Sequence, residues 1–398
     1  MIALMLLPVY IIINIYIFWR LHRWITLFDG PVGHRYFRIT ICAIFVILSS
    51  TMLIGFLLHQ GNAAKIFKVI GNYWAAVQIF SLPVLGIFEI LLFFRKKQFP
   101  DETNREKNKL FAKKVGAVCL SAIIVLSLWG SVNSRIIRTT YYNIRIDKHT
   151  DNIENLRIVL LSDLHLGINS DCKQIGRLVA KINKLKPDIV LIAGDIFDNN
   201  FESIEEPDKM TRLFKKIHSK YGTYACYGNH DIEEKILAGF TFSSDKPKIS
   251  SPEMDDFLVN SNIKLLKDQG TIIDDSFYLY GRPDSERPGS GITKRKTPNE
   301  ITSNLDKEMP IIVLDHQPKE LEELSRAGVD LDLSGHTHGG QIFPGNLLIG
   351  FFWKNPYGEQ DIGKMKSIVS TGVGNIGPNV RLGAKAEICL INVDFSFE

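Results

Sequence analysis

Residue types that bind metals or transfer protons gather at a few short segments in the second half of the sequence. These segments are Asp163-Leu164-His165, Gly194-Asp195, Gly228-Asn229-His230-Asp231, His316 and Gly335-His336-Thr337-His338. Five of the six histidines after residue 150 lie in them. Two carboxylates, an amide oxygen and four or five imidazoles suit two divalent transition ions such as Mn, Fe or Zn. Ca²⁺ prefers oxygen alone, and structural zinc usually takes thiolates.

Each of these segments closes a short apolar run that is typical of a buried strand. The runs are LRIVLLSD (156–163), DIVLIAGD (188–195), TYACYGNH (223–230), IIVLDH (311–316) and VDLDLSGH (329–336). They are nearly continuous in Val, Ile and Leu, as in sheets that are covered on both faces. Residues 171–186 and 205–220 have helical spacing, with Asp171 as the expected N-cap of the first helix. This order predicts an α/β fold in which the carboxyl ends of the strands bring the polar groups together.

The segments resemble the motifs of the calcineurin-like metallophosphoesterase superfamily, which run D-x-H, G-D, G-N-H-[DE], H and G-H-x-H. The resemblance covers about 155–395, and GHTHGGQ (335–341) together with PNVRLG (378–383) looks like the bacterial branch of membrane-linked or exported members. It implies a four-layer sandwich in which two mixed β-sheets are flanked by helices. It also implies a metal-dependent hydrolase of phosphate esters.

The same resemblance implies a role for each ligand in a site with two divalent metal ions. It places Asp195 as the bridge between the ions, with Asp163, His165 and His338 on one of them and Asn229, His316 and His336 on the other.

His230 follows a ligand directly and has no metal assigned, so we expect it to protonate or stabilise the leaving oxygen. Asp231 either orients that imidazole or caps a helix expected at 231–237. Arg381 contacts a substrate phosphate or forms a salt bridge, and both interpretations stay open. His218 lies on an amphipathic helix and is expected to be a solvated surface residue.

The first third of the chain reads as a membrane domain. Four apolar runs, at about 2–19, 39–58, 73–94 and 115–133, approach the ~20 residues that a helix needs to cross the hydrocarbon core. No basic residue precedes the first run, so it does not read as a cleavable signal peptide. Glu89 is the only ionisable residue within a run, and we expect it to reach the interface or to pair with Arg95, Lys96 or Lys97.

Charge separates the two parts and predicts an orientation. Residues 1–134 hold 14 Lys/Arg against 5 Asp/Glu, and residues 135–398 hold 33 against 38, so the domain expected at 155–398 after a linker at 135–154 is not basic. No nucleic-acid partner is expected. Segments 20–38 and 95–114 carry four and eight Lys/Arg, against two in 59–72. The positive-inside rule then places the catalytic domain of this integral membrane protein outside the cytoplasm.

A membrane anchor favours a membrane-associated substrate, such as a phospholipid or a lipid-linked pyrophosphate. Related bacterial enzymes cleave UDP-2,3-diacylglucosamine in lipid A synthesis, an alternative that conflicts with the expected orientation. A non-catalytic metal-binding scaffold is a further alternative, which the complete ligand set disfavours. The run NLLIGFFWK (346–354) is either an interfacial loop beside the site or a core strand.

Overall fold

The computed structural model describes residues 2–58, 61–233, 236–237, 240–241 and 250–395. Its contacts divide the chain into two compact units. The first unit runs to Val132 and takes in the short segments 236–243 and 377–380; the rest of the chain forms the second unit. The small ribbon of β5 (Ile236–Leu237) and β6 (Phe240–Thr241) belongs to the first unit.

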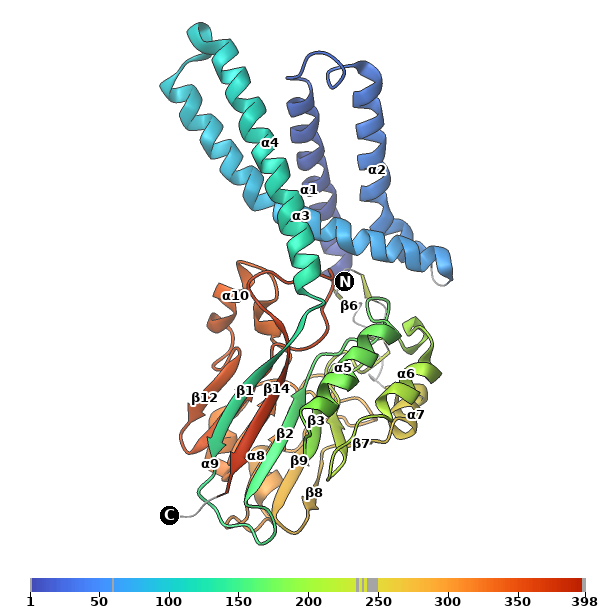
Figure 1. The fold of residues 1–398 in the computed structure, drawn as a ribbon, viewed down its shortest axis with the longest axis vertical. Helices are drawn as coiled ribbons and strands as arrows, with labels where there is room; N and C mark the ends of the chain where they lie inside the picture. The colour runs from blue at the N-terminus through green and yellow to red at the C-terminus, as the bar shows by residue number, and fades with distance from the viewer. Residues whose placement is uncertain (1, 59–60, 234–235, 238–239, 242–249, 396–398) are drawn as a thin grey trace. The chain divides into compact units, whose positions relative to one another are not determined.

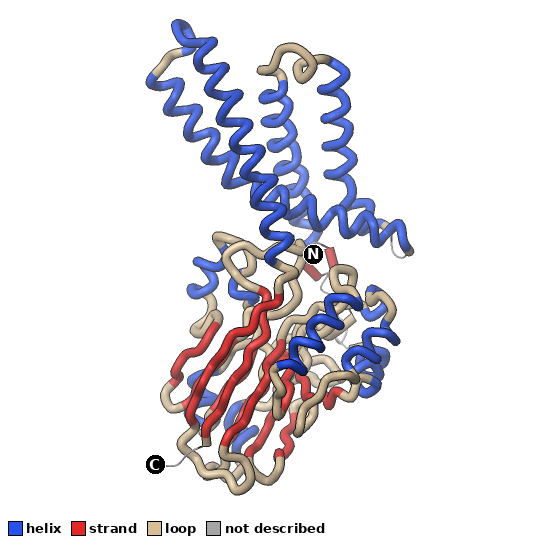
Figure 2. Tube along the Cα trace, in the orientation of Figure 1, coloured by secondary structure: helices blue, strands red, loops and turns tan. Residues whose placement is uncertain are grey.

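Long helices make up most of the first unit (Figures 1 and 2): α1 (Ile2–Ile25), α2 (Arg35–Leu57), α3 (Asn62–Gln98) and α4 (Asp101–Asn133). Among the described residues, three of them, α2, α3 and α4, are long and apolar enough to cross a membrane. We expected four such helices. The first apolar run, 2–19, is helical within α1 but is not among the three, so three candidate spans replace the expected four.

The single acid within the apolar runs pairs across helices rather than along its own. Glu89 of α3 forms an ion pair with Arg20 of α1 and accepts a hydrogen bond from the hydroxyl of Tyr16 at 3.3 Å. The expected pairing with the basic residues at the end of α3 is therefore wrong. The reason is spatial, because the guanidinium of Arg20 is brought against Glu89 by packing between helices far apart in sequence.

Two six-stranded mixed sheets form the frame of the second unit. The first sheet has the order β1 (Ile137–Arg145), β14 (Ala386–Asp394), β2 (Asn155–Leu161), β3 (Ile189–Ala193), β4 (Thr223–Cys226), β7 (Ile263–Leu265). The second has the order β12 (Gly358–Ile362), β13 (Met365–Val369), β11 (Leu331–Ser334), β10 (Ile311–Leu314), β9 (Phe277–Gly281), β8 (Gln269–Ile273). The pairs β14–β2, β12–β13 and β8–β9 are antiparallel, and the other pairs are parallel.

Helices flank both sheets and complete four layers (Figure 1). The helices α5 (Cys172–Lys184), α6 (Pro207–Phe214) and α7 (Pro252–Asn260) pack on the first sheet. The helices α8 (Pro298–Thr302) and α9 (Leu321–Ala327) pack on the second. Asp171 caps α5 as expected, since its carboxylate accepts the N–H of Gln174 at 2.6 Å. The expected layered α/β sandwich is confirmed.

Strand β2 shows why the sequence builds these layers. Its side chains alternate between two apolar cores, because successive residues of a strand point to opposite faces. Ile158 and Leu160 face the second sheet and join the core between the sheets, whereas Val159 and Leu161 join the core beneath α5 and α6. All four are fully buried, so β2 has no polar side chain between the exposed Arg157 and Ser162. Buried side chains that bind metals or transfer protons can therefore follow only after the strand ends.

The segment expected to be a linker, 135–154, contains strand β1. This strand pairs in parallel with β14 over nine residues, from Ile137 opposite Ala386 to Arg145 opposite Asp394. It forms the edge of the first sheet and buries Ile144 in the core between the sheets. Polar side chains alternate along its outer face, so the sequence did not show the continuous apolar run of a buried strand. The folded unit therefore begins near residue 133 rather than 155.

This pairing predicts that β1 stabilises the second unit. A fragment that starts at residue 147 loses β1 and exposes the backbone edge and apolar face of β14. We expect it to aggregate, or to melt at least about 5 °C below a fragment that starts at residue 134. Thermal melting of the two fragments tests this. Equal melting temperatures and yields would mean that 135–146 is a linker after all.

Candidate metal centre

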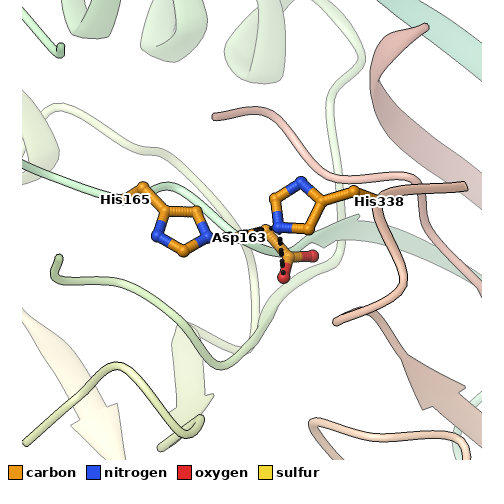
Figure 3. A group of neighbouring side chains, drawn as sticks. All are labelled: Asp163, His165 and His338. Atoms are coloured by element: carbon orange, nitrogen blue, oxygen red, sulfur yellow. Dashed lines mark hydrogen bonds and ion pairs between the residues drawn. The ribbon is translucent and has the colours of Figure 1, made fainter. Parts of the chain in front are cut away.

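Three of the expected ligands converge after strands β2 and β11 (Figure 3). The Nε2 atoms of His165 and His338 lie 3.2 Å apart, and Nε2 of His338 is 3.5 Å from Oδ1 of Asp163. All three side chains are buried, and both imidazole rings point toward one position. The two strands belong to different sheets, so the group joins the facing layers of the sandwich.

A second group forms where β4, β10 and β11 end. Nε2 of His316 lies 3.0 Å from Oδ1 of Asn229 and 3.1 Å from Nδ1 of His336. His316 is fully buried, whereas Asn229 and His336 are half-exposed. This second group therefore forms the side of the centre that solvent can reach.

Asp195 lies between the two groups. Its Oδ2 is 3.3 Å from Nε2 of His316 and 3.8 Å from Nε2 of His165. Its Oδ1 accepts the backbone N–H of His230 at 2.8 Å, which fixes the carboxylate. All seven residues that the sequence singled out as ligands are thus brought together, with Asp195 in the central place.

The backbone at this centre is strained in a way that the ligand positions require. Five of the seven ligands have positive φ angles, between 45° and 71°, a region that non-glycine residues rarely adopt. They are Asp163, His165, Asp195, His336 and His338. Such turns redirect each side chain immediately after its strand, so that donors from separate strands face a common point.

Glycines in the motifs give the centre its close packing. A Cβ on Gly194 would lie 2.6 Å from Nδ1 of His316, and one on Gly228 would lie 2.3 Å from Oδ1 of Asp195. Both distances are shorter than any van der Waals contact, and the neighbouring atoms belong to ligands. These two positions therefore accept only glycine while the ligands keep their places.

Interactions behind the ligands set their orientation. Nδ1 of His316 donates to the carbonyl of Ala193 at 2.9 Å, which leaves its Nε2 free to bind a cation. The backbone N–H of His316 donates to Asp315 at 2.7 Å. Asp315 is itself held by the buried guanidinium groups of Arg282 and Arg295, at 2.8 and 2.9 Å. Removing either arginine would leave a buried charge without its full complement of partners.

The absence of a proton on His336 favours metal binding by this half-exposed ligand. Burial lowers the pKa of His336 to about 3 and lowers that of His338 well below its usual value. Both imidazoles are then neutral near pH 7, the form that binds metals. Burial also opposes the charged form of His316, but the carboxylate of Asp195 raises its pKa well above the usual value. A cation that binds here takes the place of that proton.

The donor set fits a pair of divalent transition ions. Within the group Asp163, His165 and His338 and within the group Asp195, His316 and His336, the donor atoms lie within 4.8 Å of one another, and Asp195 lies between the two groups. A proton between the facing nitrogens of His165 and His338 joins only that pair, whereas a divalent cation can also take oxygen ligands. Mixed N/O ligation of this kind suits Mn, Fe or Zn.

Asp198 is a functional candidate that sequence reasoning missed. Its Oδ1 lies 3.5 Å from Nδ1 of His165 and 3.8 Å from Nδ1 of His230. The carboxylate thus faces the far nitrogen of a metal ligand and also that of the expected proton donor. Its position three residues after Asp195, in the same strand-end loop, was the available signal.

Asp231 has neither of the roles expected for it. Its carboxylate accepts the backbone N–H groups of Phe197 at 2.8 Å and Gly228 at 2.6 Å, and so ties two strand-end loops together. Residues 231–232 form a bend rather than the start of a helix, 234–235 lie outside the described residues, and 236–237 belong to strand β5. Burial raises the pKa of Asp231 to about 7. The group that faces His230 is Asp198 instead.

Arg381 is fully buried, which excludes direct contact with a substrate phosphate. Its guanidinium donates to the carbonyls of Thr371, Gly374 and Lys385 at 2.6–2.7 Å. It also lies 3.4 Å from Nδ1 of His338. Arg381 therefore supports the ligand His338, and neither of the two roles expected for it applies. His218 is exposed, as expected, but it lies beyond the end of α6 at Phe214 and not on a helix.

Comparisons with known proteins agree with this geometry. Residues 156–340 match the family model of the calcineurin-like phosphoesterases. An uncharacterized metallophosphoesterase of Campylobacter jejuni is 28% identical over 96% of this chain and 94% of its own length. A transmembrane protein with metallophosphoesterase domain from Danio rerio is 29% identical over 79% of this chain and 73% of its own length. The UDP-2,3-diacylglucosamine pyrophosphatase LpxG of Chlamydia trachomatis is 26% identical over 56% of this chain and 76% of its own length.

The matched residues 156–340 include all seven ligands and the ends of the strands that carry them, β2, β3, β4, β10 and β11. Relatives that share this domain are named as metallophosphoesterases or as a transmembrane protein that contains one. Residues 156–340 are therefore similar to the calcineurin-like phosphoesterases, and this domain indicates a metal-dependent phosphoester hydrolase.

Proposed function

We propose that this protein is a membrane-anchored dinuclear hydrolase of phosphodiester, phosphomonoester or pyrophosphate bonds in a lipid-linked substrate. One ion would be held by Asp163, His165 and His338 and the other by Asn229, His316 and His336, with Asp195 shared. Bound there, the ions supply Lewis-acid activation of water and neutralise charge at phosphorus. The observation that carries the proposal is the central place of Asp195, 3.3 and 3.8 Å from ligands of both groups.

His230 is proposed to protonate the leaving oxygen. Its ring stands edge-on to that of His165, with centroids 5.0 Å apart, and its donor atom lies within 4.8 Å of those of His165 and Asp198. Its Nδ1 faces Asp198, which leaves Nε2 as the nitrogen that can serve the substrate. Asp198 would hold the ring in that orientation, as a carboxylate does for a catalytic imidazole.

A lipid-linked substrate is supported by the architecture of the chain. We call the second unit, which holds the metal centre, the catalytic unit. Three candidate spans precede it, so the enzyme is confined to the surface of a membrane. The alternative of a UDP-2,3-diacylglucosamine pyrophosphatase is supported by the similarity to LpxG. The two substrates differ in location, because the nucleotide-linked precursor is expected in the cytoplasm. The orientation of the catalytic unit therefore discriminates between them.

Replacing Asp195 by Asn should remove activity while the fold is retained. Loss of the shared negative charge weakens both ions together, so hydrolysis of a bis-aryl phosphate should fall at least about 100-fold and the metal content should drop. Asp332→Asn is the matched control. Asp332 is also buried, and burial raises its pKa to about 8, so the amide resembles the protonated acid. Full turnover and normal metal content in the Asp195 variant would exclude a shared role.

Replacing His230 by Ala should leave the metals bound and lower kcat by about 10²–10⁴, the usual contribution of a general acid. The loss should shrink for substrates with good leaving groups, which need little protonation. Substitution of the exposed His218 by Ala provides the control and should change nothing. A collapse of metal content in the His230 variant would instead identify a ligand.

The catalytic unit should face away from the cytoplasm, because segments 20–38 and 95–114 carry four and eight basic residues against two in 59–72. A cysteine at His149, whose side chain is 77% exposed, should react with an impermeant maleimide in intact cells. A cysteine at the exposed Glu102 should react only after permeabilisation. The half-buried native Cys42 and Cys172 are first replaced by Ser. The opposite pattern would favour the nucleotide-linked alternative.

A further inference from the structure

Apolar side chains gather on one short stretch of the catalytic unit. Of the ten large hydrophobic residues exposed among the described residues of this unit, six lie between 343 and 357. We call these six the apolar rim: Phe343, Leu347, Leu348, Phe351, Phe352 and Tyr357. Phe351 and Phe352 are 83% and 78% exposed, the highest values among these ten hydrophobic residues. Concentrated exposure of this kind marks a binding surface more often than single scattered residues do.

The rim is built on an ordered frame. It contains the short helix α10 (Gly345–Leu348) and a 3-10 turn at Ile349–Phe351, so neither a core strand nor a disordered loop describes it. On one side, the amide of Asn355 donates to the carbonyl and hydroxyl of Ser367 in β13, at 3.0 and 3.1 Å. On the other, Gln341 exchanges two hydrogen bonds with the backbone of Ile376, at 3.0 and 3.1 Å.

The rim is continuous with the metal centre. Trp353 lies between Phe352 and Tyr357 of the rim, and its half-buried indole stands edge-on to the ring of His336, with centroids 5.2 Å apart. His336 is one of the two half-exposed ligands, so the rim borders the side of the centre that solvent reaches. The ammonium of Lys319 lies 5.8 Å from the same indole. A surface that binds the rim is therefore next to the reacting position.

We propose that the apolar rim inserts into the lipid bilayer and so brings lipid phosphoesters to the metal centre. The inference rests on the proposed function, because it explains how a lipid-linked substrate reaches buried ligands. The occupant is identified as a bilayer by the tether, since α4 ends at Asn133 and β1 begins at Ile137. So short a connection keeps the unit beside a membrane at all times. Aromatic and aliphatic side chains followed by the exposed Lys354 are also the composition of an interfacial anchor.

The first experiment measures insertion in the full chain, reconstituted in vesicles of phosphatidylcholine and phosphatidylglycerol. With Cys42 and Cys172 replaced by Ser, an environment-sensitive fluorophore is attached to a cysteine at Phe352. The matched control carries it at Val259, which is 72% exposed on α7 and outside the rim. Lipids brominated in the acyl chains should quench the probe at 352 at least about two-fold more than the probe at 259, because an interfacial anchor reaches the headgroup and acyl boundary. Equal quenching would overturn the proposal.

The second experiment separates delivery of the substrate from chemistry. The double variant Phe351→Ser with Phe352→Ser should keep its melting temperature and its turnover of a soluble bis-aryl phosphate. Its turnover of a phospholipid in the same vesicles should fall about ten-fold, as expected from loss of two inserted aromatic side chains. Val259→Ser with Ile272→Ser removes two exposed apolar residues outside the rim and should change neither rate.

The outcomes distinguish this proposal from the proposed function. Loss of both activities in the double variant at an unchanged melting temperature would place the rim in the catalytic machinery and overturn its role as an anchor. Unchanged turnover of the phospholipid would overturn it directly. Absence of any hydrolysis by the unsubstituted protein would instead contradict the proposed function. Quenching at 352 that depends on protein concentration and not on brominated lipid would show that a second copy covers the rim.

Discussion

Buried nitrogen lone pairs that face one another are the constraint on which this catalytic unit depends. His165 and His338 bring two Nε2 atoms to 3.2 Å, and the second group brings Nε2 of His316 to 3.1 Å from Nδ1 of His336. A proton between such a pair can join the two nitrogens in a hydrogen bond. A divalent cation satisfies both, together with the shared carboxylate of Asp195. The left-handed turns, the crowded glycines and the two facing sheets all serve to hold these donors at one point.

The ligand residues could be predicted from the sequence because each motif closes an apolar run that must be a buried strand. The resemblance implied two mixed sheets, and the structure distributes the ligand-bearing strands between them: β2, β3 and β4 in the first and β10 and β11 in the second. Nothing in local periodicity reports which strands share a sheet. That information lies in contacts between segments more than a hundred residues apart.

The errors have equally physical causes. Strand β1 pairs with β14 near the opposite end of the chain, and its polar outer face resembles a linker until that partner is known. The role of Asp231 depends on which backbone N–H groups reach it, and Phe197 comes from a different loop. Asp198 was missed because an acid in a strand-end loop is common, and only its distances to two histidines distinguish it. In the first unit, the basic segment 95–114 is mostly helical and extends α3 and α4 beyond their apolar runs. Those helices therefore reach 37 and 33 residues.

The hydrogen bonds of Asn355 and Gln341 fix the backbone beneath the apolar rim before anything binds to it. Ordering a flexible segment costs roughly 1–2 kcal/mol of backbone entropy for every residue, and that cost has already been met here by folding. Only rotamer freedom of the exposed side chains remains to be lost on contact. The free energy of apolar transfer is then available almost undiminished, even to a small surface. A contact of this kind can form and release repeatedly without any refolding step.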